Sequence, residues 1–136
     1  MHAWNQWISA IRNPWNPWSG TDYNDSSKFT LVDIKGMLAQ DSPANQQALA
    51  TFNGYLDTVA AGLDALQQKQ IVVIWRLMSE MNGNWFWWGH RSQADYIALW
   101  RYVFNYLTVG KSLHHLIWVY ESDSGTHSGT PSDYYL

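Results

Sequence analysis

Cysteine is absent from the 136-residue sequence, which excludes a disulfide framework and a thiolate metal site. Asp22, Asp25 and Asp33 lack the spacing of a calcium-binding loop. The sequence also has no glycine-rich loop of the kind that cradles phosphates. We therefore expect no bound metal and no cofactor.

Blocks of positive charge and long apolar runs are missing as well. The 8 lysines and arginines are scattered along a chain of net charge −3, so nucleic acid and anionic membranes are not expected partners. No apolar run approaches the ~20 residues that span a membrane. The first residues, Met-His-Ala-Trp-Asn, have neither the charged nor the apolar region of a signal peptide, so none is expected in this chain.

Tryptophan, by contrast, is abundant, with 10 residues in a chain of 136. A buried tryptophan needs space for its indole ring and a partner for its N–H group, and a core of this size does not need so many. We expect about half of them to pack in the core. The others are expected to line a concave surface, because the electron-rich face of an indole suits the axial C–H groups of sugar rings.

Two amphipathic helices are predicted from apolar residues at three- and four-residue spacing. The first starts at Ser42-Pro43, a capping side chain followed by proline, and runs to about residue 69; a short helix is predicted before it, over 31–38. The second starts at a capping box over 92–95 and ends near Gly110, a predicted C′ residue. The apolar stripe of the first helix comprises Leu49, Phe52, Leu56, Val59, Leu63 and Leu66.

Two apolar segments, 71–77 and 115–120, are predicted as strands. The first is a β-branched run typical of a strand buried on both faces of a parallel sheet, and the second is predicted to be buried like it. The order helix, strand, helix, strand is that of a parallel α/β sheet with right-handed crossovers. After Glu121 the sequence is rich in Gly, Ser and Thr and is predicted to contain no further element.

This order predicts the fold class, α/β with part of a (β/α)8 barrel. A complete barrel takes about 250 residues, so residues 1–136 are expected to form around half of one, as a single partial domain. Half a barrel would leave two open sheet edges and part of its interior exposed. We therefore expect it to need the missing half, a second copy of the chain or another partner.

The end of the first predicted strand carries the candidate chemistry. The segment reads IVVIWRLMSEMNGNWFWWG over 71–89, with Glu80 just beyond the strand and a shelf of indoles expected at 85–88. Strand alternation puts Arg76, Met78 and Glu80 on one side, at the strand end where barrels hold their active sites. Apolar surroundings disfavour the charged form of a carboxyl group, which suits a general acid. The alternative is a solvated loop glutamate with Arg76 as its ion-pair partner.

The same segment resembles the signature of glycoside hydrolase family 26, whose best-known members are endo-β-1,4-mannanases. In that family it commonly reads R-P-[LF]-H-E-x-[NT]-G-x-W-F-W-W-G, and two further segments are similar to the family's W-H-x-x-N-P and Y-x-x-L-W-R-Y. This sequence departs from the pattern at Leu77, in place of proline, and at Ser79, in place of a histidine close to the reacting sugar. The matching residues are His2 to Asn5, Arg76, Glu80, Asn82-Gly83, Trp85 to Gly89, Tyr96 and Leu99 to Tyr102.

The resemblance implies a (β/α)8 barrel and a retaining glycosidase with two catalytic glutamates, acting outside the cell on β-1,4-mannan or a related β-glycan. Glu80 matches the acid/base, which protonates the leaving oxygen and later deprotonates water. Trp85 matches a tryptophan that stacks on the sugar beside the scissile bond, and Trp88 is assigned to substrate binding with it. His2 matches a substrate-contacting histidine, and Arg76 an arginine that steadies the catalytic carboxylates.

A retaining mechanism needs a second carboxylate about 5–5.5 Å from the first. In the family it comes from a later strand, which we expect to lie beyond Leu136. Glu121 and Asp123 end a neighbouring strand about 4.8 Å away, but we expect neither to be the nucleophile. Two other hypotheses stand beside the enzyme: a noncatalytic carbohydrate-binding or assembly module, and two copies that close a barrel-like interior across a symmetric interface.

Overall fold

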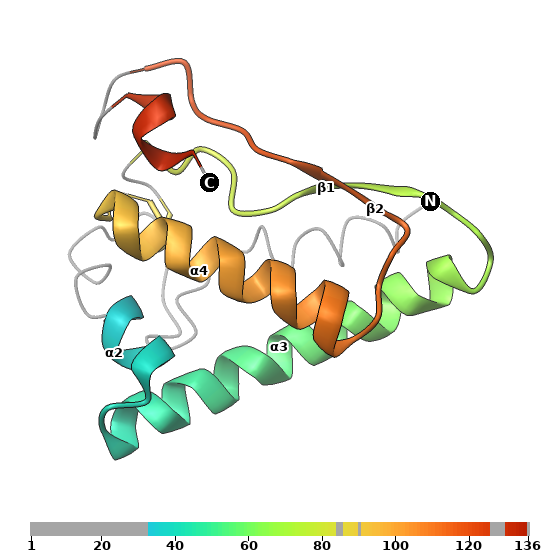
Figure 1. Cartoon of the computed structure of the whole chain (residues 1–136), viewed down its shortest axis with the longest axis horizontal. Helices are drawn as coiled ribbons and strands as arrows, with labels where there is room; N and C mark the ends of the chain where they lie inside the picture. Colours follow the sequence, from blue (N-terminus) through green and yellow to red (C-terminus); the bar gives the residue numbers. More distant parts are fainter. Residues whose placement is uncertain (1–32, 84–85, 90, 126–129, 136) are drawn as a thin grey trace.

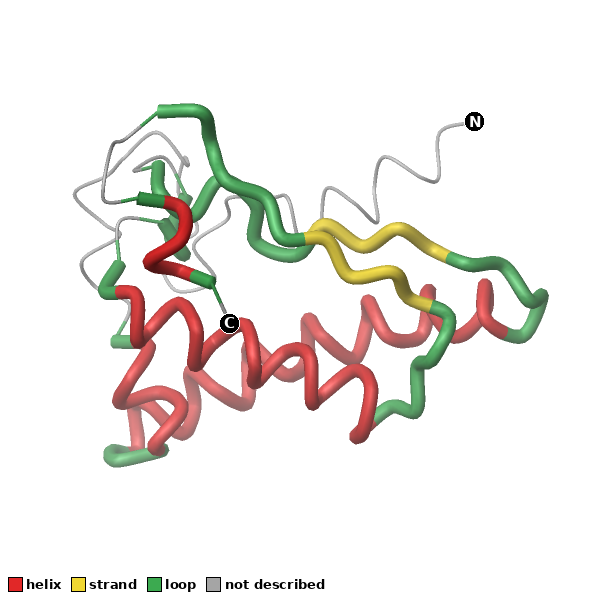
Figure 2. Tube along the Cα trace, turned by 45° about the horizontal axis from the view of Figure 1, so that its top comes forward, coloured by secondary structure: helices red, strands yellow, loops and turns green. Residues whose placement is uncertain are grey.

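The computed structural model describes residues 33–83, 86–89, 91–125 and 130–135. In this part of the chain, two helices are followed by a strand, a third helix and a second strand. Figures 1 and 2 show the two long helices lying on the same side of the pair of strands. The elements are α2 (Ile34–Ala39), α3 (Pro43–Gln67), β1 (Val73–Arg76), α4 (Gln93–Asn105), the π-helical turn η2 (Tyr106–Gly110), β2 (Leu116–Val119) and the 3-10 turn η3 (Pro131–Tyr134).

The two strands pair in parallel, as the order of elements predicts. Their register runs from Val73 opposite Leu116 to Arg76 opposite Val119. The connection from β1 to β2 passes through α4, so the segment from β1 to β2 is a β–α–β unit. The carboxyl ends of both strands therefore meet at one edge of the sheet.

Both long helices begin where the sequence predicts them. The Ser42 hydroxyl accepts a hydrogen bond from the backbone N–H of Asn45 at 3.2 Å, at the start of α3, and Ser92 accepts one from the N–H of Asp95 at 3.1 Å, at the start of α4. These side chains satisfy N–H groups that have no partner inside the helix. All of the predicted apolar stripe of α3 except Leu66 is buried. The short helix α2 covers most of its predicted range.

The end of the second helix differs in detail from the prediction. Its last turn widens into η2, whose final residue is Gly110, so helical structure does end at the predicted glycine. The left-handed backbone expected at a C′ residue occurs instead at Ser112, with a φ of 55°. A π turn places one extra residue in the turn, which shifts the reversal of the chain beyond the glycine.

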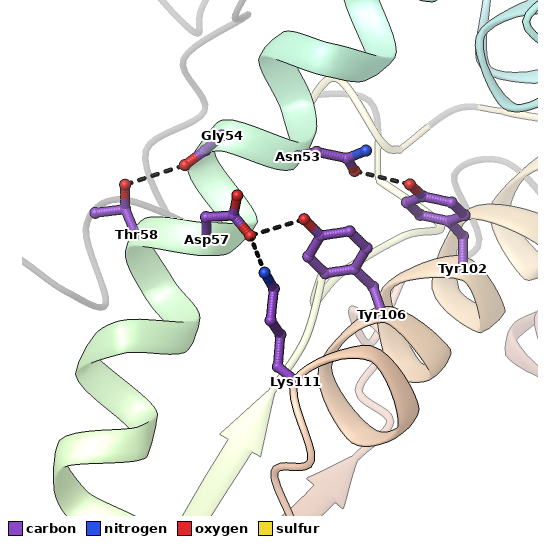
Figure 3. A network of polar contacts seen from close by, with 7 residues as sticks. All are labelled: Asn53, Gly54, Asp57, Thr58, Tyr102, Tyr106 and Lys111. Carbon is purple, nitrogen blue, oxygen red and sulfur yellow. Dashed lines mark hydrogen bonds and ion pairs between the residues drawn. The ribbon is translucent and has the colours of Figure 1, made fainter.

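A polar network fastens α3 to the end of α4 (Figure 3). The Tyr102 hydroxyl donates to Asn53 Oδ1 at 2.7 Å, and the Tyr106 hydroxyl donates to Asp57 Oδ1 at 2.7 Å. Lys111 Nζ lies 2.6 Å from the same Asp57 oxygen and 5.2 Å from the centre of the Tyr106 ring. Hydrogen bonds, an ion pair and a cation–π contact thus join two helices on the outer surface.

The sheet is covered on one face only, so the prediction of strands buried on both faces is wrong for the described residues. Trp75 faces the helices and is buried, and its register partner Trp118 packs against the same core. On the opposite face, Ile74 and its partner Ile117 keep 69 % and 54 % of their surface exposed. Residues alternate between the two sides along a barrel strand, and this second face is the one that lines a barrel interior.

Candidate active site

The chain leaves β1 along a strained path. The strand ends at Arg76, and two of the next residues, Met78 and Glu80, have left-handed backbones with φ angles of 46° and 58°. Strand alternation stops at this point, and Met78 is buried. The expectation that Met78 lies on one side together with Arg76 and Glu80 is therefore wrong, because it assumed an extended backbone as far as residue 80.

Two buried side chains hold the carbonyl groups of this strained segment. The Tyr96 hydroxyl donates to the Met78 carbonyl oxygen at 3.1 Å, and the Trp88 indole N–H donates to the Ser79 carbonyl oxygen at 2.8 Å. Burial raises the pKa of Tyr96 well above its ordinary value, so its hydroxyl keeps the proton that it donates. Left-handed backbone at residues other than glycine costs on the order of 1–3 kcal/mol and persists where the surroundings enforce it.

The Glu80 peptide is held on both sides. Its N–H donates to the carbonyl oxygen of Glu121 at 2.9 Å, and its own carbonyl accepts from the N–H of Gly83 at 2.9 Å. Glu80 itself is half-buried at the carboxyl end of β1. The backbone of this glutamate is thus fixed by the loop that follows β2 as well as by its own loop.

The aromatic run after Glu80 forms part of the core rather than an exposed shelf in its described part. Trp88 is only 2 % exposed, and its indole stacks on Phe86 with ring centres 4.5 Å apart. Trp87 is also buried and meets Phe52 of α3 edge-to-face at 5.9 Å. Trp88 is enclosed in this way, and its indole N–H supports the Ser79 carbonyl. The substrate contact assigned to Trp88 stays a prediction.

A close approach of two glycines closes the loop that holds these aromatics. A Cβ atom on Gly89 would lie 2.5 Å from the carbonyl oxygen of Gly83, which is part of the backbone. The N–H of Gly89 donates to the Phe86 carbonyl at 3.0 Å. Only glycine fits at position 89 without moving the neighbouring backbone.

Arg76 forms an ion pair with Glu121. The alternation of β1 and β2 puts both residues on the face opposite the helices, and their side chains keep 45 % and 34 % of their surface exposed. The guanidinium and carboxylate groups therefore stand at the carboxyl edge of the sheet, within reach of solvent. The sequence predicted an arginine acting on the catalytic carboxylates, and its carboxylate partner in the structure is Glu121.

Asn82 connects the Glu80 loop to the loop that follows β2. Its side-chain NH2 group donates to the carbonyl oxygens of Asp123 at 3.0 Å and Gly125 at 2.6 Å, and its oxygen accepts from the N–H of Asp123 at 2.8 Å. The residue is fully buried. The sequence indicated only a turn at Asn82-Gly83, because a contact across 41 residues leaves no local signal.

The segment after β2 contains η3, so the prediction of no further element after Glu121 is wrong. Tyr134 of η3 is buried and meets Tyr96 edge-to-face at 5.8 Å. The Thr130 backbone N–H and hydroxyl both donate to the Asp133 carboxylate. Thr130 followed by proline and then Asp133 is a helix-start pattern, so a local signal for this turn was present in the sequence.

Two of the predicted sugar contacts, His2 and Trp85, lie outside the described residues. Among the residues that are described, no group of three or more histidine, aspartate or glutamate side chains could hold a metal ion. None of the helices that the structure describes is both long enough and apolar enough to cross a membrane. The described part of the site is a half-buried glutamate, an exposed ion pair and the buried groups that hold them.

Comparison with known proteins decides the family. The sequence profile of Glycosyl hydrolase family 26 matches residues 4–135. The chain belongs to this family. It is 34 % identical over 124 residues to a mannan endo-1,4-beta-mannosidase of Bifidobacterium adolescentis, and the aligned region covers 88 % of this chain and 11 % of the relative. It is 33 % identical over 128 residues to mannan endo-1,4-beta-mannosidase A of a Piromyces species, and the aligned region covers 93 % of this chain and 20 % of the relative.

Solved structures of family 26 enzymes have the same fold. A beta-mannanase from a symbiotic protist of the termite Reticulitermes speratus, complexed with gluco-manno-oligosaccharide, matches with a TM-score of 0.70 and 25 % identity over 96 % of this chain and 43 % of that one. Bacillus subtilis mannanase man26 matches with a TM-score of 0.67 and 25 % identity over 90 % of this chain and 36 % of that one. The predicted fold class, part of a (β/α)8 barrel, is confirmed. The chain spans less than half the length of each of these relatives.

Proposed function

We propose that the chain carries Glu80 as the acid/base residue of a glycoside hydrolase that cleaves β-1,4-mannan or a related β-glycan. The observation that carries this proposal is the left-handed backbone of Glu80 at the carboxyl ends of two parallel strands, hydrogen-bonded on both sides of its peptide. Strained backbone of this kind clusters at active sites, and barrels hold their chemistry at this edge. The relatives named above supply the substrate class.

The proposed reaction uses Glu80 twice. Its protonated carboxyl group gives a proton to the glycosidic oxygen as the bond from that oxygen to the anomeric carbon breaks, so the leaving sugar departs with a hydroxyl group. A second carboxylate bonds to the anomeric carbon and forms a glycosyl–enzyme intermediate. Glu80, now ionised, takes a proton from the water molecule whose oxygen displaces that carboxylate. The family resemblance assigns the second carboxylate to a strand beyond Leu136.

Other residues of the proposed site bind the sugar. We assign stacking on the sugar ring to Trp85 and a hydroxyl contact to His2, as the family resemblance implies. Arg76, half-exposed beside its partner Glu121, supplies donors at the same edge. A polymer of sugars does not enter a cell, so we place the reaction outside it.

The loss of activity on replacing Glu80 tests the proposal. In the intact protein, Glu80→Gln keeps the size of the side chain but removes the transferable proton, and should lower the release of reducing sugar from β-1,4-mannan about 10²–10⁴-fold. Asp64→Asn, the same chemical change on the exposed surface of α3, is the control and should leave the rate unchanged.

Activity that survives Glu80→Gln would overturn the assignment. Quenching of tryptophan fluorescence by a manno-oligosaccharide, with no hydrolysis by the wild-type protein, would instead indicate the noncatalytic carbohydrate-binding module. A mass of twice the chain in solution would indicate the association of two copies.

A further inference from the structure

We propose that Asn82 is a positioning residue for Glu80, because its side-chain amide fastens the loop that carries this glutamate to the loop that follows β2. The inference rests on the proposed function of Glu80 and adds the residue that fixes its place. Asn82 itself is fully buried and does not reach substrate, so its effect on the reaction is exerted through the backbone.

The side-chain amide of Asn82 forms hydrogen bonds with backbone groups of one distant segment, the loop that follows β2. Its two N–H bonds are directed to the carbonyl oxygens of Asp123 and Gly125, at 3.0 and 2.6 Å, and its oxygen accepts the N–H of Asp123 at 2.8 Å. An amide side chain offers two donor hydrogens and one carbonyl oxygen, and all three functions are engaged here. This arrangement fixes both the position and the orientation of the opposing segment.

The loop after β2 is shaped to receive the amide. The Asp123 carboxylate accepts a hydrogen bond from the N–H of Gly125 at 2.8 Å, which closes a tight turn and directs the two carbonyl groups toward Asn82. Two residues before Asp123, the carbonyl of Glu121 accepts the N–H of Glu80 at 2.9 Å. The two loops are therefore joined at two points, one at Glu80 itself and one at Asn82.

The second joint is needed because the backbone around Glu80 is strained. With a φ of 58°, Glu80 occupies a region that residues other than glycine seldom adopt. A strained conformation persists only when the surrounding structure over-determines it. Without the amide, the two loops would lose one of the two joints that the described residues show, and the carboxyl group of Glu80 could move relative to the glycosidic oxygen.

Asparagine is the residue type that this joint requires. Aspartate has nearly the same shape but, when ionised, offers only acceptors. In Asn82→Asp, the carbonyl oxygens of Asp123 and Gly125 would lose their donors and face a carboxylate. The substitution therefore reverses the polarity of the joint while leaving its volume almost unchanged, and the loops should separate.

The test compares Asn82→Asp with Asn53→Asp in the intact protein. The control makes the same change on α3, where the carboxylate can still accept the hydrogen bond from Tyr102. On a manno-oligosaccharide, Asn82→Asp should lower kcat by about 10²-fold, the effect of an error of about 1 Å in position, with KM changed far less. Asn53→Asp should leave both constants unchanged.

A second substrate separates positioning of the acid from a general loss of structure. A nitrophenyl mannobioside releases nitrophenolate, which leaves without protonation. If Asn82 positions the general acid, the loss of kcat/KM in Asn82→Asp is at least tenfold smaller on this substrate than on the oligosaccharide. Equal losses on both substrates, or an unchanged kcat in folded Asn82→Asp, overturn the inference.

Hydrogen exchange of the wild-type protein provides a test that needs no variant. The backbone N–H groups of Glu80 and Asp123 should exchange together, with similar protection, because one opening event separates both loops. Fast exchange at Asp123 beside full protection at Glu80 overturns the inference. If Glu80→Gln is inactive while Asn82→Asp is fully active, the proposed function stands and only the role of Asn82 fails; if Glu80→Gln is fully active, the proposed function fails.

Discussion

The backbone N–H of Glu80 donates a hydrogen bond to the carbonyl oxygen of Glu121 at 2.9 Å. The contact lies beyond the last registered pair of the sheet, Arg76 opposite Val119, and joins the loops that follow the two strands. The position of the proposed acid/base thus depends on a segment about 40 residues further along the chain. The hydrogen bonds of Asn82 join the same two loops, and that to Asp123 connects residues 41 apart in sequence.

The indole N–H of Trp88 should stabilise the fold through the Ser79 carbonyl. Trp88→Phe keeps an aromatic ring but leaves this carbonyl without its donor, whereas Trp100→Phe removes a buried indole N–H that has no partner among the described residues. Trp88→Phe should therefore cost about 1–3 kcal/mol more free energy of unfolding than Trp100→Phe. Urea denaturation of both variants measures the difference, and equal losses would contradict this role for the indole.

The close approach of Gly89 to Gly83 predicts that a Gly→Ala substitution destabilises the protein at position 89, and Gly54 provides a control for the same substitution. In Gly89→Ala, the new methyl group would meet the Gly83 carbonyl oxygen at 2.5 Å, so the loop should shift and lose about 1–3 kcal/mol of stability. Gly54→Ala lies on an exposed face of α3 with no atom within 4 Å of the new methyl group, and should gain about 1 kcal/mol. Thermal denaturation should therefore show a lower Tm for Gly89→Ala and a higher Tm for Gly54→Ala than for the wild type.

The helices could be predicted because their signals are local. Ser42 and Ser92 cap their helices through N–H groups three residues away, and the apolar stripe of α3 repeats within one continuous segment. The parallel pairing of β1 and β2 follows from the order of elements and the length of the connection. Glu80 could likewise be proposed from its place after a strand and from the family pattern around it.

The remainder of the site depends on contacts that sequence patterns do not record. Trp88 and Trp85 belong to the same aromatic run, and nothing in that run indicates that Trp88 turns inward to stack on Phe86. The prediction that the strand over 71–77 is buried on both faces assumed a sheet covered on both sides, and it fails at Ile74, which stays exposed. The extended backbone assumed for Met78 fails because Tyr96 and Trp88 stabilise a left-handed path.

Acid should weaken the network that joins α3 to α4. The hydrogen bond from Lys111, and after it the one from Tyr106, lower the pKa of Asp57 below 3.8. Because the folded pKa lies below the unfolded value, the contribution of Asp57 is present above about pH 3.8 and is lost as the pH falls through the folded pKa. Asp57 is exposed, so the effect is small and salt-sensitive.

Two variants on α3 test this prediction. Asp57→Asn should show a slightly lower Tm at neutral pH and a weaker dependence of Tm on acid. Asp64, which accepts a hydrogen bond from the side chain of Gln68 at the end of α3, is the control, and Asp64→Asn should leave the packing of α3 against α4 unchanged. The same decline of Tm with acid in wild type and Asp57→Asn would show that Asp57 does not contribute.

Alkaline conditions should lower the free energy of unfolding through the buried hydroxyl of Tyr96. Burial raises the pKa of Tyr96 above its ordinary value of 10.0. The folded state therefore holds a proton that the unfolded state loses, so the contribution of Tyr96 is complete below pH 10 and declines as the pH rises above it. Tyr96→Phe should be less stable at neutral pH, because the Met78 carbonyl loses its donor, and should lose less stability above pH 10. A parallel decline in both proteins would contradict this account.

The central claim is that Glu80 supplies a proton to the leaving group, and the dependence of rate on the leaving group tests it most directly. The measurement is the ratio of kcat/KM for Glu80→Gln to that for the intact wild-type protein, on a manno-oligosaccharide and on a nitrophenyl mannobioside. We predict a loss of about 10²–10⁴-fold on the oligosaccharide and a far smaller loss on the nitrophenyl substrate, whose leaving group needs no proton. An equal loss on both substrates, or none on the oligosaccharide, would contradict the role of Glu80 as the general acid.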